Sequence, residues 1–112
     1  MPSVSVDDLA GHYGIPDVLF IDVEGFEVRV LQGAKQTMTR LPDCFIEVHT
    51  GCGLENYGFS VESVLSWFDP RDYQLFIATE DGGQFHSYQL GSSPPAKRFF
   101  LVALSTTDCL SK

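Results

Sequence analysis

The feature that most constrains the fold of this chain is an alternation between short apolar runs and segments whose apolar residues repeat with helical spacing. The apolar runs occur at 18–23, 44–50, 73–78 and 98–104. The helical spacing occurs at 6–13, 26–40 and 61–68. Continuous apolar runs are typical of strands covered on both faces of a parallel sheet. The order therefore predicts an α/β fold with three parallel strands, one final antiparallel strand, and helices on the faces.

Length and composition indicate a single domain over residues 1–112. A hydrophobic content of 44% is enough for a core, and the polar tail at 105–112 is expected to fray. Before the first apolar run, Ser5 and Asp8 form a capping-box pattern for the helix at 6–13, whose apolar face we expect to be buried. Val4 and Leu9 are placed for a hydrophobic staple at the start of that helix.

The net charge limits the classes of partner. A formal charge of -8 repels phosphate backbones and anionic lipids, so we expect no nucleic-acid groove and no membrane surface. No run approaches the roughly 20 apolar residues that cross a bilayer, and the start of the sequence lacks the features of a secretory signal. We therefore expect a cytoplasmic protein. Its cysteines, Cys44, Cys52 and Cys109, lack a C-x-x-C spacing, so we interpret them as free thiols.

An acidic cluster follows the first apolar run, where VLFIDVEGFE spans residues 18–27. Glu24 and Glu27 lie near the start of a predicted helix, where carboxylates gain about 0.3–1 kcal/mol each from the helix dipole. Asp22 differs because its neighbours are apolar, and a buried carboxylate needs a partner. Asp22 is therefore a candidate either for capping the turn or for lining a site.

Glu47 and His49 pose the same question in the next apolar run. They lie two residues apart and share one face of a strand, so His49 could pair with Glu47. Because ligands collect beyond the carboxyl ends of strands in open α/β sheets, Asp22 is expected nearby. The three side chains could accept protons or hold a hard metal ion, or they could form only a salt-bridged crevice. The sequence alone assigns no metal.

Four motifs then carry a resemblance to a known family. They are SVDDL at 5–9, IDVEGFE at 21–27, VLQGA at 30–34 and IEVH at 46–49. In their order and spacing they resemble the second half of the FkbM-type S-adenosylmethionine-dependent methyltransferases. The resemblance implies a Rossmann-like sheet of seven strands, of which this chain would supply the fourth to the seventh.

The resemblance also implies roles for residues. Asp22 and Glu24 would face the methyl donor, S-adenosylmethionine, and Asp22, Glu47 and His49 would be the catalytic residues that line the acceptor side. Transfer to a hydroxyl group is the expected reaction, with one of these side chains accepting its proton. Phe20 stands where the family usually has lysine. The family's glycine-rich turn and ribose-binding acid have no counterpart in these residues, so we expect no activity from this chain alone.

Two other interpretations stay open. The chain could be a noncatalytic module that associates with itself or a partner, or a small independent enzyme that uses the crevice. In the partial sheet, the strand at 18–23 would be an exposed apolar edge, which proteins usually cover or pair. We therefore expect either a homodimer or pairing with a complementary N-terminal half at that edge.

Overall fold

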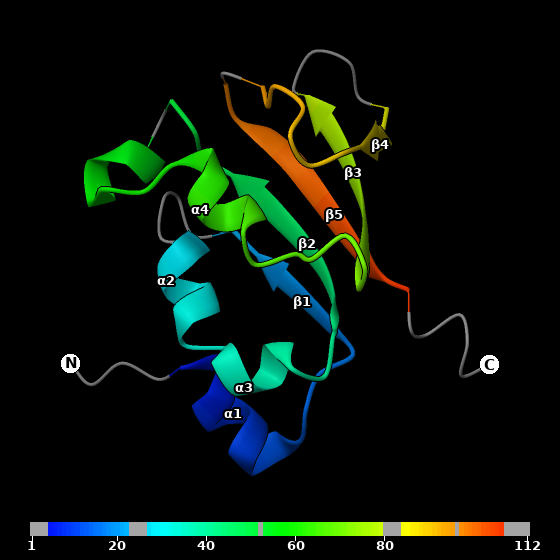
Figure 1. Cartoon of the computed structure of the whole chain (residues 1–112). Coiled ribbons are helices and arrows are strands. Elements are labelled where there is room, and N and C mark those ends of the chain that lie inside the picture. Colours follow the sequence, from blue (N-terminus) through cyan, green and yellow to red (C-terminus); the bar gives the residue numbers. More distant parts are fainter. Residues whose placement is uncertain (1–4, 23–26, 52, 80–83, 96, 107–112) are drawn as a thin grey trace.

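The computed structural model describes residues 5–22, 27–51, 53–79, 84–95 and 97–106. Within these ranges the chain forms a mixed α/β fold around one five-stranded sheet (Figure 1). The strands, in chain order, are β1 (Val18–Ile21), β2 (Asp43–Val48), β3 (Tyr73–Thr79), β4 (His86–Tyr88) and β5 (Phe99–Ser105). Their order across the sheet is β1-β2-β5-β3-β4.

The direction of the strands confirms only part of the predicted sheet. β1 and β2 are parallel, whereas β5 is antiparallel to both of its neighbours, β2 and β3, and β4 is antiparallel to β3. The predicted three parallel strands and one antiparallel strand are confirmed in part: β1, β2 and β3 run in the same direction and β5 runs against them, but only β1 and β2 pair in parallel, and most pairings in the sheet are antiparallel. Strand β4 returns antiparallel along one side of β3, and β5 then pairs antiparallel with the other side of β3, so β5 lies between β2 and β3.

The helices are α1 (Val6–Tyr13), α2 (Glu27–Gln32), α3 (Lys35–Met38) and α4 (Val61–Leu65), with a 3₁₀ turn at Leu54–Tyr57. The single helix predicted for 26–40 is thus two helices, separated at Gly33 and Ala34. Helix α1 lies against this break, because the Asp7 amide donates to the Gly33 carbonyl at 2.9 Å. A Cβ atom on Gly33 would come within 3.0 Å of Ser5 Cβ, so the close approach needs glycine.

Helix α1 begins as predicted and packs differently. The capping box of Ser5 and Asp8 is present. Of the predicted apolar face, only Val6 packs against the core, where it is partly buried, and Tyr13 is 85% exposed, so the expectation of a buried face is wrong for most of the helix. The helix is also held by Asp7, whose carboxylate accepts hydrogen bonds from the Gln36 and Thr37 amides and from the Thr37 hydroxyl. The predicted staple involves Val4, which lies outside the described residues.

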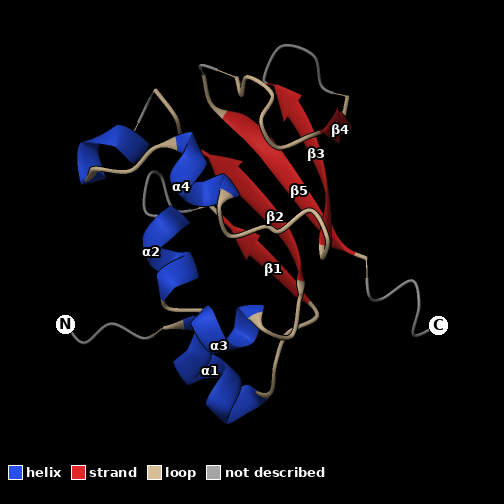
Figure 2. Cartoon of the chain, in the orientation of Figure 1, coloured by secondary structure: helices blue, strands red, loops and turns tan. Residues whose placement is uncertain are grey.

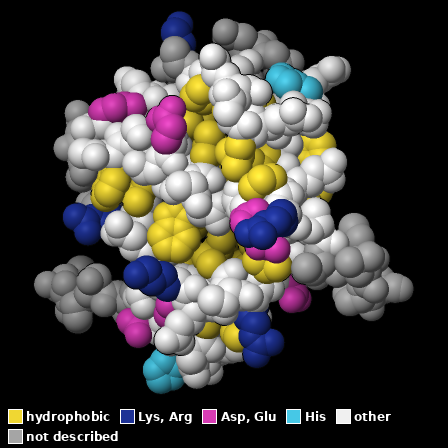
Figure 3. Space-filling view, in the orientation of Figure 1, with side chains coloured by type: hydrophobic (Ala, Val, Ile, Leu, Met, Phe, Trp, Pro, Cys, Tyr) yellow, Lys and Arg dark blue, Asp and Glu magenta, His cyan; other side chains and the backbone are white. Residues whose placement is uncertain are grey.

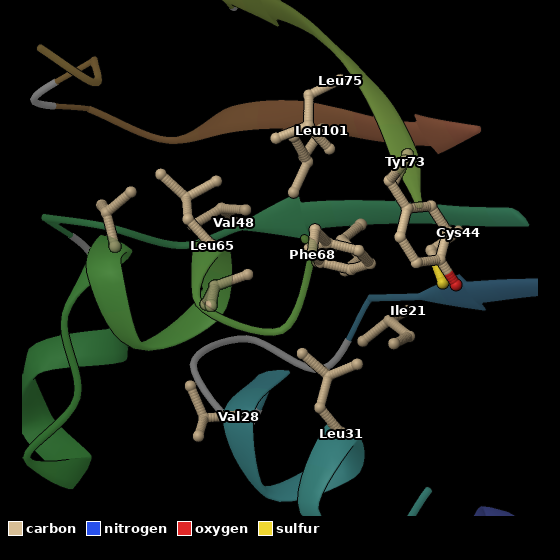
Figure 4. Close-up of a cluster of buried hydrophobic side chains, with 14 of the residues drawn as sticks. Ile21, Val28, Leu31, Cys44, Val48, Leu65, Phe68, Tyr73, Leu75 and Leu101 are labelled. Carbon is tan, nitrogen blue, oxygen red and sulfur yellow. The ribbon is translucent and has the colours of Figure 1, made fainter. Parts of the chain in front are cut away.

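The hydrophobic core lies between one face of the sheet and the helices α2 and α4 (Figures 2 and 4). Strand β2 illustrates this arrangement: its side chains alternate along its whole length, so that every second one is buried on the core face and the others are only partly buried. The side chains of the core that Figure 4 labels are Ile21, Val28, Leu31, Cys44, Val48, Leu65, Phe68, Tyr73, Leu75 and Leu101. Burial raises the pKa of the Cys44 thiol to about 12, which makes it an unreactive core residue.

The opposite face of the sheet is aromatic and less covered. Phe45 on β2 stacks on Phe20 of β1 with 5.0 Å between ring centroids, and it also contacts Phe85 and Phe100. The helices of the described chain lie on the other side of the sheet (Figure 1). We call this surface the aromatic face; it consists of Val18, Phe20, Phe45, Phe85, Phe100 and Leu104.

Strand β1 forms one edge of the sheet, as predicted. Covering on both of its faces was also predicted, and this is wrong, because Val18 is 60% exposed and Phe20 is 69% exposed. In the orientation of Figure 1, other hydrophobic side chains reach the surface between charged ones (Figure 3). No helix in the described part of the chain is long and apolar enough to cross a membrane.

Candidate functional site

The candidate site lies where β1 and β2 end. These strands are parallel and in register, with Ile21 opposite Ile46, so the next residues, Asp22 and Glu47, are neighbours at the same edge of the sheet. His49 follows β2 and lies beside both of them. The structure therefore brings together the three predicted residues Asp22, Glu47 and His49. Glu24, the other predicted donor-binding residue, lies outside the described residues.

A buried pair fixes the orientation of His49. Its Nδ1 lies 2.8 Å from Oε1 of Glu27, and its backbone amide donates to the other oxygen of the same carboxylate at 3.5 Å. Glu27 is fully buried and His49 nearly so. Because one ring nitrogen is held by a buried carboxylate, the other, Nε2, is the nitrogen available for chemistry.

The second ring nitrogen faces two carboxylates. Nε2 of His49 lies 3.7 Å from Oδ1 of Asp22 and 3.8 Å from Oε1 of Glu47. Both distances exceed a hydrogen bond. One ligand atom from each of the three residues lies within 4.8 Å of the others, an arrangement that could hold a metal ion. The side chain of Asp22 is half exposed, so the cluster opens to solvent on that side.

Glu47 lies among groups of both charges. Its pKa is raised, first by burial and then by its hydrogen bond with Asp22 and the negative charge there. His49 and Arg98 act in the opposite direction, and the Arg98 Nε atom lies 3.3 Å from Oε1 of Glu47. Two carboxylates this close favour sharing a proton or attracting a cation.

The loop after β2 is ordered by its own hydrogen bonds. The Glu55 carboxylate accepts from the Thr50 hydroxyl at 2.7 Å and from the Gly51 amide at 2.9 Å. The Leu54 amide donates to the carbonyl of His49 at 3.1 Å. These bonds hold the backbone on the C-terminal side of His49, while Glu27 holds its ring.

Sequence reasoning missed two members of the site. Glu27 was interpreted as a carboxylate in the first turn of a helix, stabilised by the helix dipole, whereas it is the buried partner of His49. The signal was present, since Glu27 closes the IDVEGFE motif. Arg98 carried no local signal, because it reaches Glu47 only after β5 has paired with β2.

Another hollow lies at the opposite end of β1 and β2. This pocket has a volume of about 570 Å³, and it is lined by Ala10, Gly14, Ile15, Pro16, Asp17, Arg40, Leu41 and Pro42. Its titratable side chains are Asp17 and Arg40, which form no cluster comparable to that around His49. The chemistry of the described chain is therefore concentrated at the carboxyl ends of the strands.

The comparison with protein families decides where this chain belongs. The methyltransferase FkbM domain matches residues 1–75. The chain belongs to the FkbM methyltransferase family. The matched segment contains β1, β2 and all of the carboxylates around His49, while Arg98 lies beyond it. Comparisons with curated proteins and with solved structures give no significant match.

The family implies S-adenosylmethionine, and the described residues fit part of it. The donor carries a sulfonium and an ammonium group, which carboxylates such as the half-exposed Asp22 can face. A glycine-rich turn for the methionine part and an acidic side chain for the ribose are the other usual elements of such a site. Neither is found among the residues that the structure describes.

Proposed function

We propose that this chain is the C-terminal half of an FkbM methyltransferase domain, folded as one unit, and that it carries the acceptor side of the active site. The reaction would be methyl transfer from S-adenosylmethionine to a hydroxyl group. The observation that carries the proposal is the family match combined with the convergence of Asp22, Glu47 and His49 at the ends of two adjacent parallel strands. That edge is where ligands bind in open α/β sheets.

The strand directions support this assignment. β1, β2 and β3 run the same way, and β5 is inserted antiparallel between β2 and β3. We interpret this set as the later strands of a Rossmann-like methyltransferase sheet. In that interpretation, further strands would continue the sheet beyond β1.

The roles of the side chains follow from their contacts. When bound, S-adenosylmethionine would supply the methyl group as an electrophile. His49, oriented by Glu27, would take the proton of a hydroxyl acceptor placed against Nε2, and Asp22 and Glu47 would stabilise the positive charge on the ring. The rest of the catalysis would be alignment of the hydroxyl oxygen with the methyl carbon.

The aromatic face suggests the partner that the half-domain needs. Phe20 belongs both to this face and to the open edge of β1, so one partner could extend the sheet and cover the aromatic rings together. We propose that this partner is the complementary N-terminal half of an FkbM domain, which would add strands beside β1. A second copy of the chain is the other occupant that experiments must distinguish. The proposed compartment is the cytoplasm.

A noncatalytic role is the second candidate. The exposure of Val18 and Phe20 on an edge strand favours an association module that kept the half-sheet. Such a module would bind a partner without any contribution from the pair of His49 and Glu27. The two candidates therefore differ in what happens when His49 is replaced.

The test is turnover. The chain would be co-expressed with the N-terminal half of an FkbM domain, and conversion of S-adenosylmethionine to S-adenosylhomocysteine would be followed with a panel of hydroxyl compounds. We expect turnover in the pair, no turnover from the chain alone, and a loss of about 10²–10⁴-fold in the pair carrying His49→Ala. Asp17→Asn, at the opposite end of β1, is the matched control. Full turnover in the His49→Ala pair would refute the assigned role.

A further inference from the structure

The cluster at the ends of β1 and β2 has a property that proton transfer does not require. Three side chains at the ends of two strands each bring one possible metal-ligand atom close to the others. These atoms are a carboxylate oxygen of Asp22, a carboxylate oxygen of Glu47 and a ring nitrogen of His49. These ligand atoms lie within 4.8 Å of one another. The two carboxylates repel each other, Arg98 offsets this repulsion only from the side of Glu47, and a cation between the three ligand atoms would offset it further.

His49 is prepared as a ligand by the buried carboxylate behind it. Nδ1 of His49 lies 2.8 Å from Oε1 of Glu27, and the other ring nitrogen, Nε2, faces away from Glu27 and toward the two acidic side chains. The imidazole is nearly fully buried, and its Nε2 lies 3.7 Å from Asp22 and 3.8 Å from Glu47, distances longer than a hydrogen bond. A carboxylate that holds the far nitrogen of a histidine is the usual second layer of protein metal sites.

We propose that Asp22, Glu47 and His49 bind a divalent cation, with Glu27 as the residue that orients His49. The mixture of two carboxylate oxygens and one imidazole nitrogen suits Mn²⁺ or Zn²⁺ better than Ca²⁺, which takes six to eight oxygen ligands. Three protein ligands leave coordination positions open, and the half-exposed Asp22 side shows where solvent can reach them.

Arg98 is the internal competitor of the cation. Its guanidinium contacts the same Oε1 atom of Glu47 that faces His49, at 3.3 Å. A metal ion bound there would have to share Glu47 with this positive charge, either through the second carboxylate oxygen or after a shift of the Arg98 side chain. The geometry therefore predicts that removal of the guanidinium tightens cation binding.

A bound cation would also give the acceptor a place to bind. An open coordination position can hold a hydroxyl oxygen and lower its pKa. With Nε2 bound to the cation, His49 would not be the base, and a second oxygen of Asp22 or Glu47 would take the proton in its place. This last step rests on the proposed methyl transfer. Cation binding itself does not, so the two can fail separately.

The experiment is a titration of the full chain with Mn²⁺, without donor or acceptor, followed by calorimetry and by the electron paramagnetic resonance signal of free Mn²⁺. We expect one ion per chain and binding at least about tenfold weaker in Asp22→Asn, a solvent-facing substitution that leaves the core intact. Glu27→Gln should weaken binding by about 10–100-fold, and Arg98→Gln should strengthen it.

Asp17→Asn is the matched control, because it removes the same charge at the other end of β1. Circular dichroism of each variant shows whether the fold is kept. Binding that is equal in the wild type, Asp22→Asn and Asp17→Asn would reveal only nonspecific attraction to an acidic protein and would overturn the proposal. Absence of binding at Mn²⁺ concentrations on the order of 1 mM would also overturn it, and would leave Asp22, Glu47 and His49 as a salt-bridged crevice.

Discussion

The two faces of the sheet differ in how their apolar side chains are covered. On one face, helices α2 and α4 close over residues such as Leu101, which is completely buried. On the other, rings such as Phe20 and Phe45 stack on each other while Phe20 stays 69% exposed. The sheet thus builds its hydrophobic core on one face only, while the other face leaves apolar side chains such as Phe20 exposed to solvent.

The largest expected effect is a loss of stability that depends on which face of β5 carries a leucine-to-alanine substitution. Leu101 and Leu104 belong to the same strand, but Leu101 points into the core and Leu104 is 41% exposed. Leu101→Ala should lower the free energy of unfolding by about 2–5 kcal/mol, because it leaves a cavity. Leu104→Ala should change it by less than about 0.5 kcal/mol. Urea denaturation measures both, and equal losses would show that the aromatic face is already covered in the isolated chain.

A smaller effect is expected from the polar anchor of the helical layer. Asp7→Ala should cost about 0.5–2 kcal/mol near neutral pH, because the amides of Gln36 and Thr37 lose a capping acceptor. Asp17→Ala, which removes an exposed carboxylate, is the control. Guanidinium denaturation of both variants measures the difference, and an unchanged stability of Asp7→Ala would mean that α1 is not anchored through this contact.

The effect of Asp7 should also depend on pH in a definite direction. Burial acts to raise the pKa of Asp7, but the hydrogen bonds from Gln36 and Thr37 outweigh it, and the net pKa lies below 3.8. A carboxyl group with a lowered pKa in the folded chain stabilises it above the unfolded value, and that stability is lost as the pH falls through the folded pKa. The difference between wild type and Asp7→Ala should therefore shrink below about pH 3.8 and stay constant above pH 6.

The smallest effect on stability, and the sharpest on association, is expected for Phe20→Ser. Because the ring is exposed, its loss should change the free energy of unfolding by less than about 0.5 kcal/mol. It should nevertheless weaken any association at the β1 edge, measured by light scattering after size exclusion. Tyr13→Ser serves as the control, because Tyr13 is an exposed aromatic on α1, away from β1, and this substitution should leave association unchanged. If both variants associate like the wild type, β1 is not the interface.

Local signals in the sequence predicted the elements well. The capping box at Ser5 marked the start of α1, and the strong apolar runs became β2, β3 and β5. The break at Gly33 was not predictable, because the apolar period continues through it and the interruption comes from a contact with α1. The exposure of α1 was missed for a similar reason, since periodicity shows that a helix has an apolar side but not that another element covers it.

Contacts between elements that are distant in the sequence were harder to predict. The position of β5 between β2 and β3 depends on pairings across more than 50 residues, which no local pattern encodes. Within the site, Asp22, Glu47 and His49 could be predicted because residues at the ends of parallel neighbours must meet. Glu27 was missed because its place in the first turn of a helix already gave it a local explanation.

The measurement that tests the central claim most directly is calorimetric titration with S-adenosylmethionine. The account predicts no binding by the chain alone, and one-to-one binding when the chain is paired with the N-terminal half of an FkbM domain. It also predicts weaker binding by the pair that carries Asp22→Ala. Tight binding by the chain alone would contradict the claim that this chain supplies one wall of a shared donor site, as would a stable pair that binds no donor.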